Sequence, residues 1–132
     1  MPLVKVNLRK GRSAADKAAI GDSIQSALEA TLKVPEADRY QLFTEFDDEN
    51  FRHTGSYLGL EYTPQLLIVE ITFLVGRDDT TKIALLAEIN KNLVAAGLVR
   101  ADDVFVMITE IGLANVSFGG GLAQRAPAAD AS

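Results

Sequence analysis

The residues best suited to chemistry stand at the start of the chain, where Met1 and Pro2 lead into a segment of alternating apolar residues. A proline at the head of a strand is ordinary, because its missing N–H costs no ladder hydrogen bond there. Removal of Met1 would instead leave Pro2 with a secondary amine, fixed in a ring at the tip of a strand. Since a terminal amine has an ordinary pKa of roughly 7.7–8.0, Pro2 could then act as a base, an acid or a nucleophile near neutral pH.

Two charged residues, Asp38 and Arg77, could complete a site around that amine. A guanidinium pairs with a carboxylate through two parallel hydrogen bonds, so Arg77 suits a substrate that carries a carboxylate. Asp38 could hold a water molecule or a hydroxyl group. Both residues have copies elsewhere, Asp103 and Arg12, so turn-capping and surface roles are the competing interpretation.

The chemistry open to such a trio depends on the protonation state of Pro2. A neutral Pro2 could take a proton from the carbon next to a carbonyl and return it elsewhere, which is tautomerisation. A protonated Pro2 would polarise a carbonyl, and a neutral one could also attack an aldehyde or ketone to form an iminium ion. We expect this chemistry to proceed without a metal or another cofactor.

Other residues are weaker candidates. Tyr40 and Phe118 could bind substrate, although packing is the more common role of such aromatic side chains. His53 is the only histidine and stands in a polar loop without the neighbours of a metal site, so we expect it to be solvated. The run Gly119-Gly120-Gly121 lacks the strand, turn and helix of a phosphate loop and indicates a turn.

The elements that must position these residues follow from periodicity. Apolar alternation or continuous apolar runs predict strands at residues 3–8, 38–46, 65–74 and 104–111. Ser13, with Asp16 three residues later, predicts a helix start, and apolar residues four apart predict a buried stripe that reaches about Leu32. A second helix should begin at residues 78–80.

The two halves of the chain are copies of each other. One constant offset superimposes strand, helix and strand without a gap. A chance match would not keep its register over three elements, so the repeat is the strongest signal in the sequence. The matching pairs are Val4 and Val69, Gly11 and Gly76, Arg12 and Arg77, Lys17 and Lys82, Ile24 and Ile89, Leu28 and Leu93, Val34 and Val99, Asp38 and Asp103, and Thr44-Glu45 and Thr109-Glu110.

Each copy predicts a βαβ unit with two parallel strands and a right-handed crossover. We expect one α+β domain, in which the two units form a four-stranded mixed sheet with both helices on one face. If the first and third strands are central, they must be antiparallel. The domain would cover residues 1–132, with units at 2–46 and 65–111, a long connection at 47–64, and a tail at 112–132 that ends in disorder from Ala126 on.

This layout gathers the candidate residues at one edge of the sheet. Pro2 begins the first strand, Asp38 begins the parallel second strand, and Arg77 follows the antiparallel third strand. The opposite edge receives Arg12 and Asp103, with an internal leucine in place of the proline. Only one end of the pseudo-symmetric domain can therefore carry a terminal amine.

The face of the sheet without helices should be apolar, since the third strand, residues 65–74, has apolar residues on both of its faces. An apolar face that no helix covers needs a partner. The sequence therefore predicts a homo-oligomer.

The composition excludes several classes of function. A chain of 132 residues suffices for one domain with a core, and no apolar run reaches the roughly 18 residues of a membrane helix. A net charge of −5 argues against general nucleic-acid binding. The absence of cysteine excludes disulfides and zinc–thiolate sites and favours a cytoplasmic location. We therefore expect neither nucleic acid nor a membrane as a partner.

The chain resembles the tautomerase superfamily, and within it the malonate semialdehyde decarboxylase branch. The resemblance rests on the Met1-Pro2 start, on the repeated βαβ unit, and on Val34-Pro35, Asp38-Arg39-Tyr40-Gln41, Asp102-Asp103-Val104 and Ser117-Phe118-Gly119. It implies a homotrimer with the sheets packed inward and a catalytic role for Pro2 and Asp38. It also implies that Arg77 is the second of two arginines of the branch, that Val75 replaces the first, and that Phe118 lies in an apolar wall where Val116 replaces a tryptophan.

The residues and the resemblance together predict a cofactor-independent enzyme of tautomerase type, which acts on a small carboxylated keto or enol compound. Pro2 would be the base or acid, Arg77 would bind the carboxylate, and Asp38 would assist. A decarboxylase or hydratase acting on a 3-oxo acid is the second alternative, and Val75 removes half of its expected carboxylate clamp. The third is a binding or signalling protein that keeps the fold without the chemistry.

Overall fold

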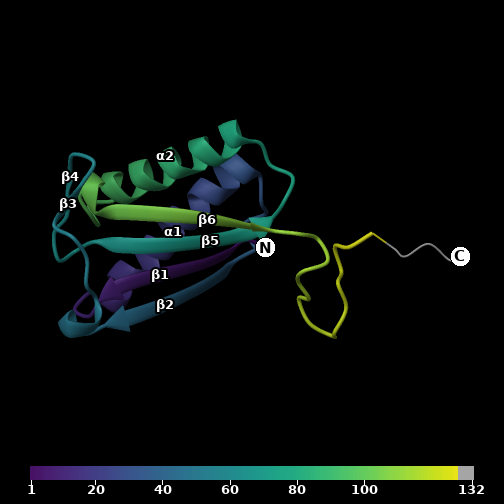
Figure 1. The fold of residues 1–132 in the computed structure, drawn as a ribbon, viewed down its shortest axis with the longest axis horizontal. Helices are drawn as coiled ribbons and strands as arrows, with labels where there is room; N and C mark the ends of the chain where they lie inside the picture. The colour runs from purple at the N-terminus through teal and green to yellow at the C-terminus, as the bar shows by residue number, and fades with distance from the viewer. Residues whose placement is uncertain (128–132) are drawn as a thin grey trace, which may run out of the picture.

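Two βαβ units build the sheet of this protein and meet at their first strands. The computed structural model describes residues 1–127, and Figure 1 shows the two helices on one side of the sheet. The main elements are β1 (Leu3–Arg9), α1 (Ala14–Leu32), β2 (Tyr40–Phe46), β5 (Leu67–Leu74), α2 (Asp79–Ala95) and β6 (Val104–Ile111). Most of the segment expected to be disordered, residues 128–132, lies outside the described part of the chain, and Ala126 at its start donates a backbone hydrogen bond to Ala123 at 3.1 Å.

The strand order is β2-β1-β5-β6. β1 runs parallel to β2 and antiparallel to β5, and β5 runs parallel to β6. In this register Leu3 pairs with Tyr40 on one side and with Thr72 on the other. The predicted four-stranded mixed sheet, with its first and third strands at the centre, is therefore confirmed.

Each helix starts with a side-chain cap. The hydroxyl of Ser13 accepts a hydrogen bond from the backbone N–H of Asp16 at 3.0 Å, as predicted for α1. In α2 the carboxylate of Asp78 accepts from the backbone N–H of Thr81 at 2.8 Å, and this bond lowers the pKa of Asp78 below its ordinary value of 3.8. No helix within residues 1–127 combines the length and the apolar composition needed to cross a membrane.

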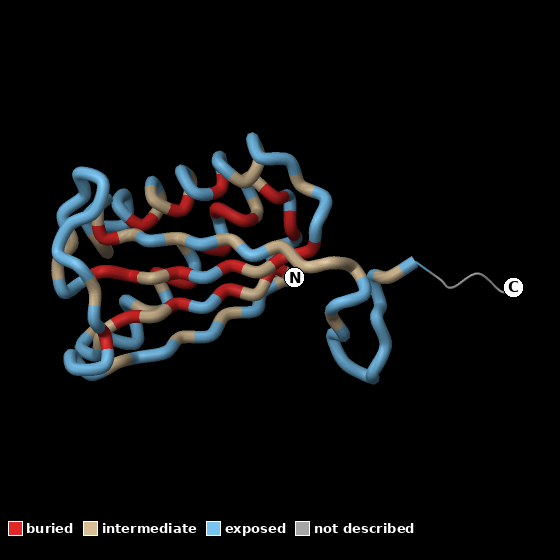
Figure 2. The backbone as a smooth tube through the Cα atoms, in the orientation of Figure 1, coloured by how far each residue is buried: buried red, intermediate tan, exposed pale blue. Residues whose placement is uncertain are grey.

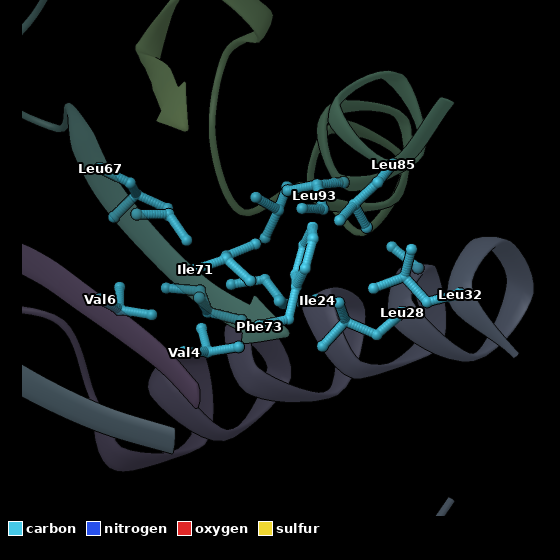
Figure 3. Packing of buried hydrophobic residues seen from close by; sticks show 14 of the residues in the cluster. Val4, Val6, Ile24, Leu28, Leu32, Leu67, Ile71, Phe73, Leu85 and Leu93 are labelled. Atoms are coloured by element: carbon cyan, nitrogen blue, oxygen red, sulfur yellow. The ribbon is translucent and has the colours of Figure 1, made fainter. Parts of the chain in front are cut away.

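The core lies between the helices and the face of the sheet that they cover. Alternate residues of β1, namely Val4, Val6 and Leu8, are at most 1% exposed, and Figure 2 shows the same alternation along the central strands. Phe73 projects from β5 toward the two helices (Figure 3) and is fully buried. Each such side chain contributes about 1.5–3 kcal/mol of hydrophobic stabilisation, so the core fixes the register that positions the sheet edges.

The uncovered face of the sheet is more polar than expected. Lys5 pairs across the two central strands with Glu70, and the side-chain amide of Asn7 donates to Glu70 at 2.9 Å. The interpretation of β5 as apolar on both faces is therefore wrong. Large exposed apolar side chains lie instead on the two outer strands, at Tyr40, Leu42, Phe105 and Met107.

The connection between the two units folds over the end of the sheet that lies opposite the N-terminus (Figure 1). It contains the 3₁₀ turn η1 (Asp48–Asn50) and a hairpin of β3 (Ser56–Tyr57) and β4 (Leu60–Glu61); a second turn, η2 (Ala101–Asp103), precedes β6. His53 is only partly exposed, with its ring edge-on to Phe51 and Tyr62 at 5.8 Å and its Nε2 3.2 Å from Arg9. The expectation that His53 is solvated is therefore wrong, because this connection packs around an aromatic cluster.

Candidate active site

The N-terminal amine lies against Asp38. The nitrogen of Met1 donates to both carboxylate oxygens of Asp38, at 2.7 and 2.8 Å. The side chain of Met1 is 9% exposed and that of Asp38 is 27% exposed, so the ion pair is partly shielded from water. The start of the chain and the start of β2 therefore meet, as the parallel pairing of β1 and β2 requires.

Asp38 is held through its backbone, which leaves the carboxylate for other partners. Its N–H donates to the carbonyl of Pro35 at 3.0 Å. The side-chain amide of Gln25, a buried residue of α1, donates to the carbonyl of Asp38 at 3.0 Å. The turn that carries Asp38 is therefore tied to the buried side of α1.

Arg77 follows β5 at the same end of the sheet. The preceding Gly76 has φ +128°, a conformation that favours glycine, and turns the chain away from the strand. The guanidinium carbon of Arg77 lies 4.9 Å from the ring centroid of the buried Phe73. Within residues 1–127 it makes no hydrogen bond or salt bridge, so its donors are available to a ligand while the ring supports its charge.

A cleft of about 810 Å³ connects these groups. It is lined by Met1, Leu32, Lys33, Val34, Pro35, Asp38, Tyr40, Leu74, Val75, Gly76, Arg77, Leu113, Phe118 and Arg125. Pro2 is buried and is not among the residues that line the cleft. Three cationic side chains and the terminal amine line the cleft together with one carboxylate. Although the net charge of the protein is −5, the cleft is therefore locally positive and attracts an anionic ligand.

The predicted site residues thus come to one place, with a difference in accessibility. Asp38, Tyr40, Arg77 and Phe118 all line the cleft, whereas Pro2 is covered. Tyr40 is 50% exposed and Phe118 is 42% exposed, so neither serves as a core residue. Both aromatic side chains are therefore in a position to contact a ligand.

The sequence did not single out Lys33 or Arg125, which also line the cleft. Lys33 is the left-handed cap of α1, with φ +59°, and its ammonium group donates to the carbonyl of Ala30 at 2.8 Å. Arg125 belongs to the tail. The repeat shows only where this tail begins, because the segment that follows β6 corresponds to the one that follows β2 and starts at the opposite edge of the sheet.

At the other end of the pseudo-symmetric sheet, the matching residues are occupied. Arg12 donates to the carbonyls of Leu98 at 2.8 Å and Gln65 at 3.1 Å. Asp103 is fully buried and accepts hydrogen bonds from both the backbone N–H and the hydroxyl of Thr63. The competing interpretation, a structural role, therefore describes Arg12 and Asp103, whereas Asp38 and Arg77 line the cleft.

The titratable side chains of the protein were also compared with the arrangement that a metal site requires. In the described part of the chain no three or more histidine, aspartate or glutamate side chains lie close enough together to hold a metal ion. The charged groups that line the cleft are an amine, a carboxylate, an ammonium group and two guanidinium groups.

Comparisons of the sequence with known proteins agree on one family. Two family models, each described as a tautomerase enzyme, match residues 38–119 and residues 2–61. The probable tautomerase YusQ of Bacillus subtilis strain 168 is 31% identical over 124 residues, which cover 94% of this chain and 98% of that protein. The probable tautomerase YrdN of the same organism is 27% identical and covers 94% of this chain and 95% of that protein.

Solved structures show the same fold. FG41 malonate semialdehyde decarboxylase, inhibited by 3-bromopropiolate, is 34% identical, covers 92% of this chain and 92% of that chain, and superposes with a TM-score of 0.84. Another malonate semialdehyde decarboxylase has a TM-score of 0.85 at 24% identity, over 92% of this chain and 94% of that chain. A fused 4-OT, solved as an asymmetric trimer, has a TM-score of 0.77 at 24% identity, over 92% of this chain and 96% of that chain.

Proposed function

This chain belongs to the tautomerase family of enzymes, and we propose that it is a cofactor-independent tautomerase acting on a small keto or enol compound that bears a carboxylate. The observation that supports this most directly is the position of the terminal amine. That amine is bonded to Asp38 in a cleft that Arg77 also lines. A proton-transfer group, a carboxylate and a carboxylate-binding group therefore surround one volume.

The proposal requires removal of Met1, so that Pro2 becomes the first residue. The nitrogen of Pro2 is three covalent bonds from that of Met1, roughly 3–4 Å away. The new secondary amine would therefore lie near Asp38. Since Met1 lines the cleft and is followed directly by the buried Pro2, its removal would open Pro2 to the cleft.

Proton transfer by Pro2 would interconvert the enol and keto forms of the substrate. Neutral Pro2 takes the proton of the enol hydroxyl and returns it to the neighbouring carbon, which leaves the ketone and regenerates the amine. Arg77 would hold the carboxylate of the substrate through parallel hydrogen bonds and so fix the carbon that receives the proton. Tyr40 and Phe118 would contact the apolar part of the substrate.

Asp38 and Arg77 act on the protonation of Pro2 in opposite directions. A carboxylate next to an amine favours the charged form of the amine, whereas a nearby guanidinium disfavours it. Of the two, Asp38 makes the direct contact with the terminal amine in the present chain. A protonated Pro2 would act first as an acid that polarises a carbonyl.

That influence of Asp38 favours a second candidate function, decarboxylation or hydration of a 3-oxo acid such as malonate semialdehyde. The 34% identity with a solved malonate semialdehyde decarboxylase supports it as well. Against it, Val75 is 49% exposed on the cleft wall, where a second guanidinium would strengthen the hold on a departing carboxylate. We therefore place tautomerisation first.

We also propose that the chain assembles as a homotrimer through the face of the sheet that carries no helices. The trimeric fused 4-OT with the same fold supports this proposal. The exposed apolar side chains of β2 and β6 would supply contact area at the two sides of that face. Sedimentation equilibrium of the purified protein would test it, and a monomer at micromolar concentration would contradict it.

The enzymatic proposal is tested by comparing the wild type with a Pro2→Ala variant. Alanine, like proline, allows removal of Met1, so both proteins present a terminal amine, and intact-mass spectrometry checks this in each sample. Ketonisation of phenylpyruvate enol should fall about 10²–10⁴-fold in the variant, the usual contribution of a positioned acid or base. Wild-type protein that keeps a residue before Pro2, such as Met1, should be as inactive as the Pro2→Ala variant.

Malonate semialdehyde serves as the second substrate in the same comparison. Turnover of this compound alone, lost in Pro2→Ala, would favour the decarboxylase or hydratase. Equal behaviour of wild type and variant on both substrates would remove the catalytic proposal and favour a protein that keeps the fold for binding or signalling.

A further inference from the structure

The tail brings a second guanidinium to the cleft. Residues 112–127 leave the sheet at the end of β6, next to the N-terminus (Figure 1), and Arg125 lines the cleft together with Arg77. Arg125 is exposed, and it forms no hydrogen bond or salt bridge with any other residue of the described chain. Its five donors are therefore open to a ligand in the cleft.

A short hydrogen-bonded loop positions Arg125. The side-chain oxygen of Gln124 accepts from the N–H of Phe118 at 3.0 Å, and its amide group donates to the carbonyl of Gly119 at 2.7 Å. Gly119, Gly120 and Gly121 all have positive φ, at 136°, 69° and 73°, so the chain can reverse direction within this loop. Gln124 thus closes residues 118–124 on themselves and brings Arg125 to the same cleft as Phe118.

Three cationic side chains line the cleft, and Arg125 differs from the other two in its contacts. Lys33 donates to the last turn of α1, and the guanidinium of Arg77 rests on the ring of Phe73. Arg125 comes from a different segment from Arg77, so the two guanidinium groups can approach an anion from different directions. A bidentate guanidinium contact fixes the orientation of a carboxylate as well as its charge.

We propose that Arg125 is a second anion-binding residue of this site and that Gln124 positions it. The proposal rests on the proposed function, because it assigns Arg125 to the carboxylated substrate of the same cleft. It predicts that the tail contributes to affinity and specificity for anionic substrates. It further predicts that Gln124 acts only through Arg125.

Malonate is a stable probe for this test, because its binding can be measured by titration calorimetry without turnover. Arg125→Gln should weaken malonate binding about tenfold, the size expected for one hydrogen bond to a charged group. Arg52→Gln is the matched control. It makes the same change of charge at an exposed arginine whose Nε donates to the carbonyl of Glu49, at the opposite end of the sheet.

The same variants separate binding from catalysis. With phenylpyruvate enol, Arg125→Gln should raise KM about tenfold and leave kcat within about twofold, because it changes a contact to the carboxylate and leaves the proton-transfer group intact. Gln124→Ala should raise KM in the same direction. In the Arg125→Gln background, Gln124→Ala should have no further effect, since its role would pass through Arg125.

Equal malonate affinity of Arg125→Gln and Arg52→Gln would overturn the inference. Additive effects of Gln124→Ala and Arg125→Gln on KM would overturn the positioning role of Gln124. The proposed function fails separately, in the Pro2→Ala comparison. If that variant were fully active while Arg125→Gln still lost malonate affinity, the anion site would stand and the Pro2 mechanism would not.

Discussion

The two ends of the sheet carry the same residue types and use them differently. At the end opposite the N-terminus, Asp103 is fully buried and Arg12 bonds two carbonyl groups. At the N-terminal end, Asp38 holds the terminal amine and Arg77 faces a cleft. A duplicated aspartate and arginine have therefore become structural at one end and available to a ligand at the other.

The difference comes from the segments that precede the two central strands. Before β5, Thr63 and Gln65 supply the hydrogen-bond partners of Asp103 and Arg12. Before β1, the amine of Met1 takes the place of such partners for Asp38. Residues in equivalent positions thus differ because of what the chain places next to them, and their identity alone does not reveal their role.

A second pair of equivalent residues shows what the repeat keeps unchanged. Lys17 bonds Glu45 at 3.0 Å in the first unit, and Lys82 bonds Glu110 at 2.7 Å in the second. Both pairs join the start of a helix to the outer strand of the same unit. Duplication has therefore kept a structural contact in both copies, whereas it has separated the roles of the residues at the sheet ends.

The largest difference is expected between substitutions of the two equivalent arginines, Arg77 and Arg12. Arg77→Gln should lower kcat/KM for a carboxylated substrate about 10- to 100-fold with little change in stability, because a hydrogen bond to a charged group is lost only when substrate is bound. Arg12→Gln should do the reverse, with kcat/KM near the wild-type value and a lower free energy of unfolding. Steady-state kinetics and urea unfolding of both variants test this, and matching kinetic losses would contradict it.

The two aspartates should show the same contrast as the arginines, with a loss of stability at one end of the sheet and a change of activity at the other, but with smaller effects. Asp103→Asn should destabilise the fold by about 1–3 kcal/mol, because a buried acceptor of two Thr63 bonds is altered. Asp38→Asn should change the unfolding midpoint little and shift the pH profile of activity to lower pH, since the group that favours protonated Pro2 is removed. An unchanged pH profile in Asp38→Asn would break the contrast between these two residues.

The smallest effects concern the two helix caps. Ser13→Ala should cost about 1 kcal/mol of stability at any pH, because the cap is uncharged. The pKa of Asp78 is lowered in the fold by its bond to Thr81, so the Asp78 cap stabilises the protein above pH 3.8 and is lost as pH falls through the lowered value. Urea unfolding should therefore separate Asp78→Ala from the wild type at pH 7 and bring them together in acid, whereas the Ser13→Ala difference should persist.

The sequence predicted the elements that repeat and missed those that do not. The offset between Asp38 and Asp103 fixed strand, helix and strand in both units, and the last strand has the predicted bounds, Val104–Ile111. The hairpin of β3 and β4 was missed, because strands of two residues carry no periodicity. The polar character of the uncovered face was missed, because Glu70 is a single charged residue within an otherwise mostly apolar strand.

The candidate site was predicted where chain topology alone decided proximity. Asp38 and Arg77 follow from the strand order, so their meeting with the chain start could be derived. Arg125 depends on a glycine turn and on the Gln124 hydrogen bonds, which no pattern of hydrophobicity records. The burial of Pro2 likewise depends on side-chain packing and not on topology.

The ion pair between Met1 and Asp38 has a consequence for the order of events during biosynthesis. In the folded protein Met1 is 9% exposed and its amine is engaged, so an aminopeptidase would meet a poor substrate. β1 gains its central neighbour only after Leu74 has been made, about 4–15 s after initiation at roughly 5–20 residues per second. Removal of Met1 would therefore be easier on the nascent chain, before β1 docks. On the proposed mechanism, a chain that folds first would stay inactive, and the fraction of a preparation that keeps Met1, measured by intact mass, should match its inactive fraction.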